Sequence, residues 1–198
     1  RKPDISLGVG SGTHAKQTAD VMVAIEQVLM DAASVDSPID RLIVVGDVNS
    51  TMAAAIAAAK LHVPVAHVEA GLRSFDRSMP EEINRLVTDA IADVLWTPSA
   101  DADENLLNEG VPQEKIDLIG NIMIDSFEML RDNIEAAGTA SELGLKHGEY
   151  ALVTLHRPSN VDALETLQPI VDALLAAAES LPVVFVAHPR TIKGLEKF

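Results

Sequence analysis

Residues 64–73 read PVAHVEAGLR, and this stretch decides the fold class. Its first five residues, 64–68, form a short, largely apolar run of the kind that is typical of a buried strand. The run ends at the carboxylate of Glu69, and Gly71 follows. In an open α/β sheet, ligands bind in the crevice beyond the carboxyl ends of the strands. The stretch therefore predicts a buried strand whose end faces a ligand site.

Outward from this stretch, short strand patterns alternate with helical ones. Helical periodicity is clear where Val21, Ile25 and Val28 fall on one face. The expected strands are residues 5–7, 41–46, 64–68, 93–97 and 116–119, and the expected helices are residues 14–31, 50–60, 80–92, a segment ending near 109, and 123–136. Asn49 or Ser50 is expected to cap the second helix. Crossovers this short hold one helix each, which predicts a parallel α/β sheet.

A second α/β unit is predicted toward the end of the chain. Residues 138–148 are polar and contain glycine, and they are followed by an expected strand at 150–155, a helix at 161–178 and a strand at 182–187. We therefore expect a first Rossmann-like domain in residues 1–137, a linker in residues 138–148, and the start of a second, incomplete Rossmann-like domain in residues 149–198. Both ends of the chain read as internal to a longer protein.

Composition excludes several classes of partner and site. The net charge of −15 repels nucleic acid and anionic lipid, so neither is an expected partner. The chain has no cysteine, which excludes disulfides, thiolate metal sites and cysteine nucleophiles and fits a reducing, cytoplasmic compartment. No apolar run reaches the roughly 18 residues that a membrane span requires.

Three carboxylates are expected to converge on one crevice. Asp47 follows the strand at 41–46, Glu69 follows the strand at 64–68, and Glu81 opens the helix at 80–92. Each has a structural alternative. Asp47 can be a turn or N-cap acid, Glu69 can be a surface-turn residue, and Glu81 can be the third residue of a capping box that starts at Ser78. Glu81 can also pair with Arg85 one turn later.

His67 shares the pleat side of Glu69 and reads primarily as a core histidine. Together with Asp47 and Glu69 it offers a second alternative, a divalent metal site, but the spacing matches no ligand motif. We therefore expect no metal.

Two strand ends in the second unit carry cations. His156 and Arg157 end one strand and precede a helix, and His188 ends the next strand in the same way. Cations beside a helix N-terminus favour an anion such as phosphate. The alternative is a generic charged loop.

These motifs together resemble the UDP-N-acetylglucosamine 2-epimerase family. The resemblance is carried by Gly46-Asp47, HVEAGLR at 67–73, PEEINR at 80–85, Gly120-Asn121 and HRP at 156–158, in this order. It implies the two-lobed GT-B fold, with two Rossmann-like domains and the nucleotide sugar between them. It also implies interconversion of UDP-N-acetylglucosamine and UDP-N-acetylmannosamine by elimination and re-addition of UDP, without a nicotinamide or other cofactor, in a homodimer.

The resemblance also assigns roles to residues. The expected catalytic residues are Asp47, Glu69, Glu81 and His156, and the expected substrate-binding residues are Arg85, Arg157, Asn84 and His188. Proton removal and return at C2 occur on opposite faces, which a cluster of carboxylates can serve. His156 matches the histidine that steadies the departing diphosphate.

Some features leave alternatives open. The family's Gly-Thr-Arg-Pro-Glu loop, its lysine and its glycine-rich nucleotide segment are not in this chain, which therefore resembles the middle of the family's proteins. Residues 158–160 read PSN where some bacterial members have Arg-Glu-Asn, a sequence associated with activation at a second site. A hydrolysing epimerase and a nucleotide-sugar binding module without chemistry remain as alternative functions.

Overall fold

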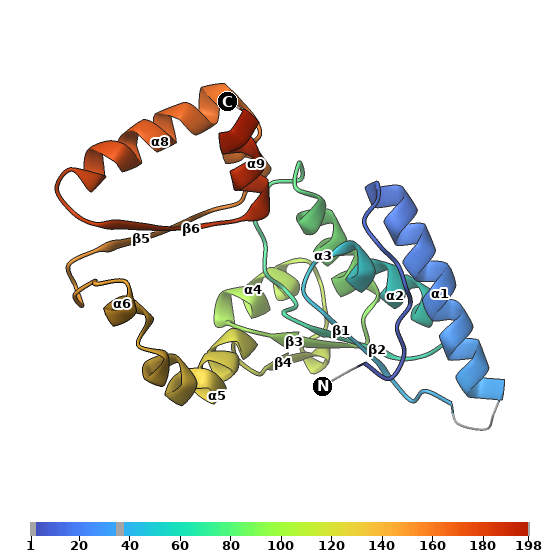
Figure 1. Ribbon diagram of the computed structural model, residues 1–198. Helices are drawn as coiled ribbons and strands as arrows, with labels where there is room; N and C mark the ends of the chain where they lie inside the picture. Colours follow the sequence, from blue (N-terminus) through green and yellow to red (C-terminus); the bar gives the residue numbers. More distant parts are fainter. Residues whose placement is uncertain (1–2, 35–37, 198) are drawn as a thin grey trace. The chain divides into compact units, whose positions relative to one another are not determined.

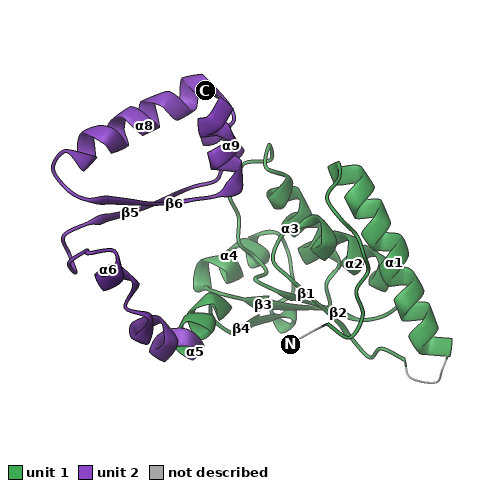
Figure 2. Cartoon of the chain, in the orientation of Figure 1, with its two compact units in different colours: residues 1–128 green, residues 129–198 purple. Residues whose placement is uncertain are grey.

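The computed structural model describes residues 3–34 and 38–197, and it divides into two compact units, residues 1–128 and 129–198 (Figure 2). The first unit holds α1 (His14–Ser34), β1 (Leu42–Val45), α2 (Asn49–Lys60), β2 (Val65–Val68), α3 (Pro80–Ile91), β3 (Val94–Thr97), α4 (Ala100–Asn108), the 3₁₀ turn η1 (Gln113–Lys115) and β4 (Ile116–Leu118). Helix α5 (Ile122–Ala137) runs from the first unit into the second. The predicted domain limits at residues 137 and 149 stay predictions.

The first unit is built on a parallel four-stranded sheet in the order β1-β2-β3-β4 (Figure 1). The register pairs Val45 with Val68 and Val68 with Trp96, so the carboxyl ends of the strands meet at one edge. This confirms the predicted parallel α/β fold. Helix α2 packs against both α1 and α3.

Alanine sets the packing of this unit. Ala53, Ala55 and Ala58 of α2 have no exposed surface, and small side chains let this helix lie close to its neighbours. The core consists of Leu29, Val44, Ala55, Ala58, Val65, Ala70, Ala92, Leu95, Leu106 and Ile116. Because the chain has few aromatic residues, many contacts between small aliphatic side chains supply the dispersion energy that aromatic rings supply in other protein cores.

The second unit contains α6 (Thr139–Glu142), β5 (Ala151–Leu155), α7 (Pro158–Val161), α8 (Leu164–Ala178), β6 (Val183–Ala187) and α9 (Pro189–Lys197). Strands β5 and β6 are parallel, and Leu155 pairs with Ala187 at their ends. The helix expected at 161–178 is divided here between α7 and α8. Within the described ranges, no helix is long and apolar enough to cross a membrane.

The strand predicted at residues 5–7 is wrong. The structure describes these residues, and they form no strand. A strand needs a neighbour for its backbone groups, and in the sheet β1 pairs with β2 alone. Ile5 is instead 60% exposed.

Candidate functional site

Two of the predicted acids lie side by side at the carboxyl edge of the sheet. Because Val45 pairs with Val68, the turns that follow β1 and β2 are neighbours. The Glu69 carboxylate reaches over Gly46, since a Cβ atom placed on Gly46 would lie 3.4 Å from Glu69 Oε2. Asp47 is the next residue along the chain. The register of the two strands thus brings Asp47 and Glu69 to one place.

Arg85 links these two turns from α3. Its Nη2 lies 2.8 Å from Asp47 Oδ2, and its Nε donates to the carbonyl of Glu69 at 3.3 Å. The Arg85 residue is only 9% exposed. A largely buried cation therefore faces both acid-bearing turns, which stabilises negative charge at this edge.

Glu81 lies in the first turn of α3, and its two predicted structural roles are wrong. Arg85 pairs with Asp47 and not with Glu81. The capping box does not form either, because Met79 occupies the N-cap, where no side-chain bond is made, and Ser78 Oγ donates to Asp76 at 2.6 Å. Glu81 is exposed, four residues before Arg85 and therefore on the same helix face.

Asn84 fastens the turn that carries Asp47. Its Nδ2 donates to the carbonyl of Asp47 at 2.8 Å and to Asn49 Oδ1 at 3.2 Å. Asn49 is the first residue of α2, and the N-cap is Val48 without a side-chain bond. The expected cap by Asn49 or Ser50 is therefore wrong. The side chain of Asn49 instead forms hydrogen bonds with Asn84, Gln17 and His14. The role of Asn84 in binding substrate stays a prediction.

His67 is a buried core histidine, as expected. It has no exposed surface, its Nδ1 lies 2.6 Å from Asp89 Oδ1, and its Nε2 lies 2.8 Å from the carbonyl of Gly46. Both ring nitrogens are thus occupied by protein groups. In the part of the chain that the structure describes, no group of three or more His, Asp or Glu residues could hold a metal ion.

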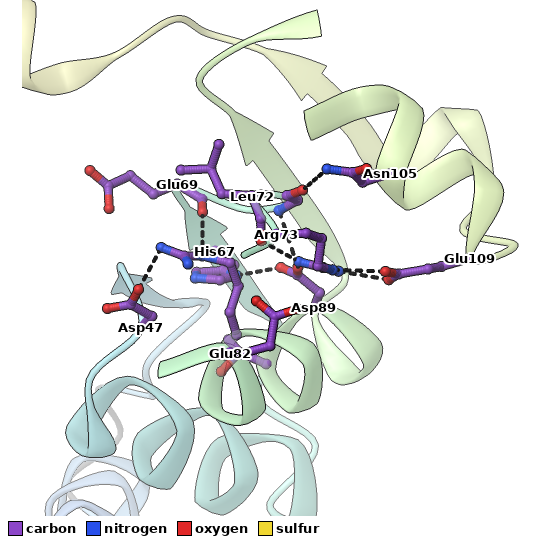
Figure 3. A network of polar contacts seen from close by, with 12 residues as sticks. Asp47, His67, Glu69, Leu72, Arg73, Glu82, Asp89, Asn105 and Glu109 are labelled. Carbon is purple, nitrogen blue, oxygen red and sulfur yellow. Dashed lines mark hydrogen bonds and ion pairs between the residues drawn. The ribbon is translucent and has the colours of Figure 1, made fainter. Parts of the chain in front are cut away.

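Sequence reasoning missed the polar network beneath the site, shown in Figure 3. Arg73 pairs with Asp89 at 2.8 Å and with Glu109 at 2.6 Å. Burial lowers the pKa of Arg73, but the hydrogen bonds and charges of Glu109 and Asp89 outweigh this and raise that pKa above its ordinary value. Arg73 is therefore a fixed cation inside the domain.

Glu82 is a second buried acid that the sequence did not reveal as such. It accepts hydrogen bonds from Ser74 N, Ser74 Oγ and Phe75 N. Burial raises the pKa of Glu82, but these hydrogen bonds and the charge of Arg73 bring it below its usual range. One signal was available: residues 82, 85 and 89 are polar and spaced to share one face of α3, and all three are buried.

In the second unit, the predicted cations gather at the ends of β5 and β6. The rings of His156 and His188 lie with their centroids 6.1 Å apart, and both residues are exposed. Arg157 occupies the N-cap of α7. Arg190 follows His188 by two residues, in α9, and pairs with Asp162 at 2.8 Å. His156, Arg157 and His188 are thus adjacent to one strand edge and open to solvent, and their anion-binding role stays a prediction.

Known proteins resemble the whole chain. Residues 1–198 match the family model described as UDP-N-acetylglucosamine 2-epimerase. A UDP-N-acetylglucosamine 2-epimerase homolog of Methanococcus maripaludis is 43% identical over 99% of this chain and 53% of its own length. A UDP-2,3-diacetamido-2,3-dideoxy-D-glucuronate 2-epimerase of Pseudomonas aeruginosa is 42% identical over 99% of this chain and 54% of its own.

Solved structures agree with this family. The UDP-GlcNAc 2-epimerase of Methanocaldococcus jannaschii, in complex with UDP-GlcNAc and UDP, has a TM-score of 0.86 at 41% identity, covering 100% of this chain and 54% of that one. The UDP-N-acetylglucosamine 2-epimerase of Rickettsia bellii has a TM-score of 0.87 at 34% identity, covering 100% of this chain and 51% of that one. This chain spans about half the length of the relatives that it matches.

Proposed function

Because this chain belongs to the UDP-N-acetylglucosamine 2-epimerase family, we propose that the protein containing it interconverts UDP-N-acetylglucosamine and UDP-N-acetylmannosamine. The observation that carries the proposal is the pair of acids at the sheet edge. The Glu69 carboxylate lies over Gly46, and Asp47 follows at once with Arg85 against it. A site that only bound an anionic nucleotide sugar would gain nothing from clustered carboxylates.

The reaction asks for proton transfer at C2 and for departure of UDP from C1. A carboxylate takes the C2 proton, the C–H electrons form the C1–C2 double bond, and the C1–O electrons leave with UDP. The reverse addition, with protonation on the other face of C2, gives the epimer. Glu69, Asp47 and Glu81 are the proposed acids and bases, because groups on separate turns and a helix can reach separate faces.

His156, Arg157 and His188 are the proposed contacts of the diphosphate. They are cationic or able to become so, and they stand together at the ends of β5 and β6. Donors aimed at the developing negative charge of the leaving group stabilise the transition state. Arg85 and Asn84 complete the proposed substrate contacts in the first unit.

A second substrate has a specific observation in its favour. The Pseudomonas aeruginosa relative is as similar as the archaeal ones, and its name assigns it a diacetamido glucuronate sugar. The hydrolysing reaction, which releases N-acetylmannosamine and UDP, uses the same acids. A homodimer and a cytoplasmic location accompany the proposal; the cysteine-free composition fits a reducing compartment.

Incubation of the complete protein in heavy water with UDP-N-acetylglucosamine, and in parallel with the UDP-linked diacetamido glucuronate sugar, tests the proposal. We expect deuterium at C2 and an equilibrium mixture of the two UDP-sugars by NMR. Free N-acetylmannosamine would identify the hydrolysing reaction instead. Exchange restricted to the diacetamido glucuronate sugar would change the assigned substrate, and no exchange with either sugar would reject the function.

A further inference from the structure

The carboxylate of Asp89 is the centre of a buried polar network (Figure 3). It faces His67 Nδ1 at 2.6 Å, Arg73 Nη1 at 2.8 Å and the backbone N–H of Gly71 at 3.1 Å. The side chains of His67, Asp89 and Arg73 are at most 2% exposed. Such groups are costly to bury, and a site that keeps them fully paired gains a rigid, single arrangement.

The network ties together the two turns that carry the proposed acids. His67 Nε2 donates to the carbonyl of Gly46, the residue before Asp47. Asp89 holds the N–H of Gly71, two residues after Glu69. Because the Gly46 carbonyl can only accept, Nε2 of His67 is the donor in that contact, while Nδ1 contacts Asp89 Oδ1. His67 thus links the two turns through both of its ring nitrogens.

The turn after β2 has a strained backbone that requires stabilising contacts. Glu69 has a φ of 67°, in the left-handed region that side-chain-bearing residues rarely adopt. Such strain persists only where the surroundings over-determine it, and it concentrates at functional sites. Here Arg85 holds the Glu69 carbonyl, and Asp89 holds the Gly71 N–H. The strained conformation is therefore fixed from both sides.

We propose that His67 and Asp89 are positioning residues, which act through the two turns to place the Asp47 and Glu69 carboxylates for reaction. This inference rests on the proposed function for its catalytic consequence. Neither residue touches the substrate, because both are buried beneath the turns. Their removal should therefore lower kcat while leaving KM and UDP affinity almost unchanged.

Two variants of the complete enzyme remove parts of the network. Asp89→Asn replaces one of the two carboxylate oxygens by an NH₂ group. The side chain can then no longer offer one oxygen to His67 and another to Arg73 and Gly71. His67→Gln can reach Asp89 or the Gly46 carbonyl but not both. A displacement on the order of 1 Å at reacting groups costs about 10²-fold in rate. We expect kcat to fall by about that factor, with KM and calorimetric UDP affinity changed less than about threefold.

Asp93→Asn is the matched control. Asp93 also accepts a backbone N–H of β2, that of Val65 at 2.9 Å, but at the opposite end of the strand. This control should keep the wild-type kcat. If all three variants lose thermal stability but the folded fraction of each keeps the wild-type kcat, the two residues are structural only and the proposal is overturned.

A second measurement decides the question even if the wild-type enzyme proves inactive on both sugars. Long-range ¹H–¹⁵N NMR should show a proton on Nε2 of His67, the nitrogen that donates to the Gly46 carbonyl. The amide signals of Gly46, Asp47 and Glu69 should move in Asp89→Asn and stay in place in Asp93→Asn. An Nε2 of His67 that carries no proton, or amide signals that do not move in Asp89→Asn, would overturn the inference independently of the reaction.

Discussion

Arg85 and Asp47 form an ion pair of 2.8 Å at the carboxyl edge of the sheet, with side-chain exposures of 11% and 28%. The same guanidinium donates to the Glu69 carbonyl, so one side chain from α3 joins the turns after β1 and β2. A planar group with several donors can make both contacts at once. A helix is thereby fastened to the end of the sheet at the place where the acids lie.

Replacing Arg85 by Lys should weaken both stability and activity. A lysine ammonium can approach Asp47 as a point charge, but it cannot reproduce the second contact with Glu69 in the same geometry. We expect a loss of about 1–3 kcal/mol in the free energy of unfolding, which is typical of a lost charged hydrogen bond at a buried site. Urea denaturation measures this, with exposed Arg77→Lys as the control. Equal stability of both variants would contradict the bridging role.

Glu69→Gln should keep the fold and UDP affinity but lose epimerisation. The substitution keeps the shape of the side chain and removes its ability to exchange a proton. General acid–base groups contribute about 10²–10⁴-fold in rate, so we expect a loss in that range. The measurement is C2 deuterium exchange in the complete enzyme, beside exposed Glu104→Gln on α4, which should react normally. Normal exchange in Glu69→Gln would remove this residue from the mechanism.

Gly71→Ala should destabilise the first unit strongly. The φ of Gly71 is 78°, and an added Cβ would lie 2.4 Å from the Ala102 carbonyl oxygen. Gly110 has a φ of 88° with nothing within 4 Å of its would-be Cβ, so Gly110→Ala measures the backbone strain alone. We expect Gly110→Ala to cost about 1 kcal/mol and Gly71→Ala clearly more, because overpacking adds about 1–3 kcal/mol. Equal losses in denaturant titrations would refute the steric part.

Glu82 should make stability depend on pH in the acid range. Its pKa in the folded protein is lowered, so its contribution is present above the unfolded-state value of about 4.3 and is lost as pH falls through the folded-state value. Glu82→Gln should therefore be less stable than wild type at neutral pH, and this difference should shrink on acidification below pH of about 4. Thermal melts across this range test it, and a difference that stays constant with pH would argue against the assignment.

His156→Ala should weaken UDP binding and slow C1–O cleavage together. Its ring lies beside His188 at the ends of β5 and β6, where cations favour a diphosphate. Calorimetry with UDP on the complete enzyme measures the affinity, and exposed His147→Ala in the preceding loop is the control. An unchanged affinity in a folded His156→Ala protein would count against the phosphate role.

Much of the fold could be predicted from local pattern. The strands around Val44 and Val68 were predictable because apolar runs bounded by turn residues have few alternatives, and the short helical crossovers demanded parallel pairing. Local pattern could not decide whether residues 5–7 form a strand, because a strand forms only where a neighbouring strand takes up its backbone hydrogen bonds. Ser78 likewise has the right spacing for a capping box but is held by Asp76 instead.

The candidate site divides in the same manner. The sequence by itself determined that Asp47 and Glu69 each follow the end of a strand, because strand ends are local features and the carboxyl ends of parallel strands lie at one edge of a sheet. That these two strands are neighbours was decided by the tertiary structure. Only the tertiary structure decided that Arg85 pairs with Asp47 and not with Glu81, and that Asp89 gathers His67, Arg73 and Gly71. The two members of each of these pairs are 16 to 38 residues apart in the sequence. Which residues pair depends on which charged side chains are buried next to each other, because a buried charge without a partner costs a large amount of free energy.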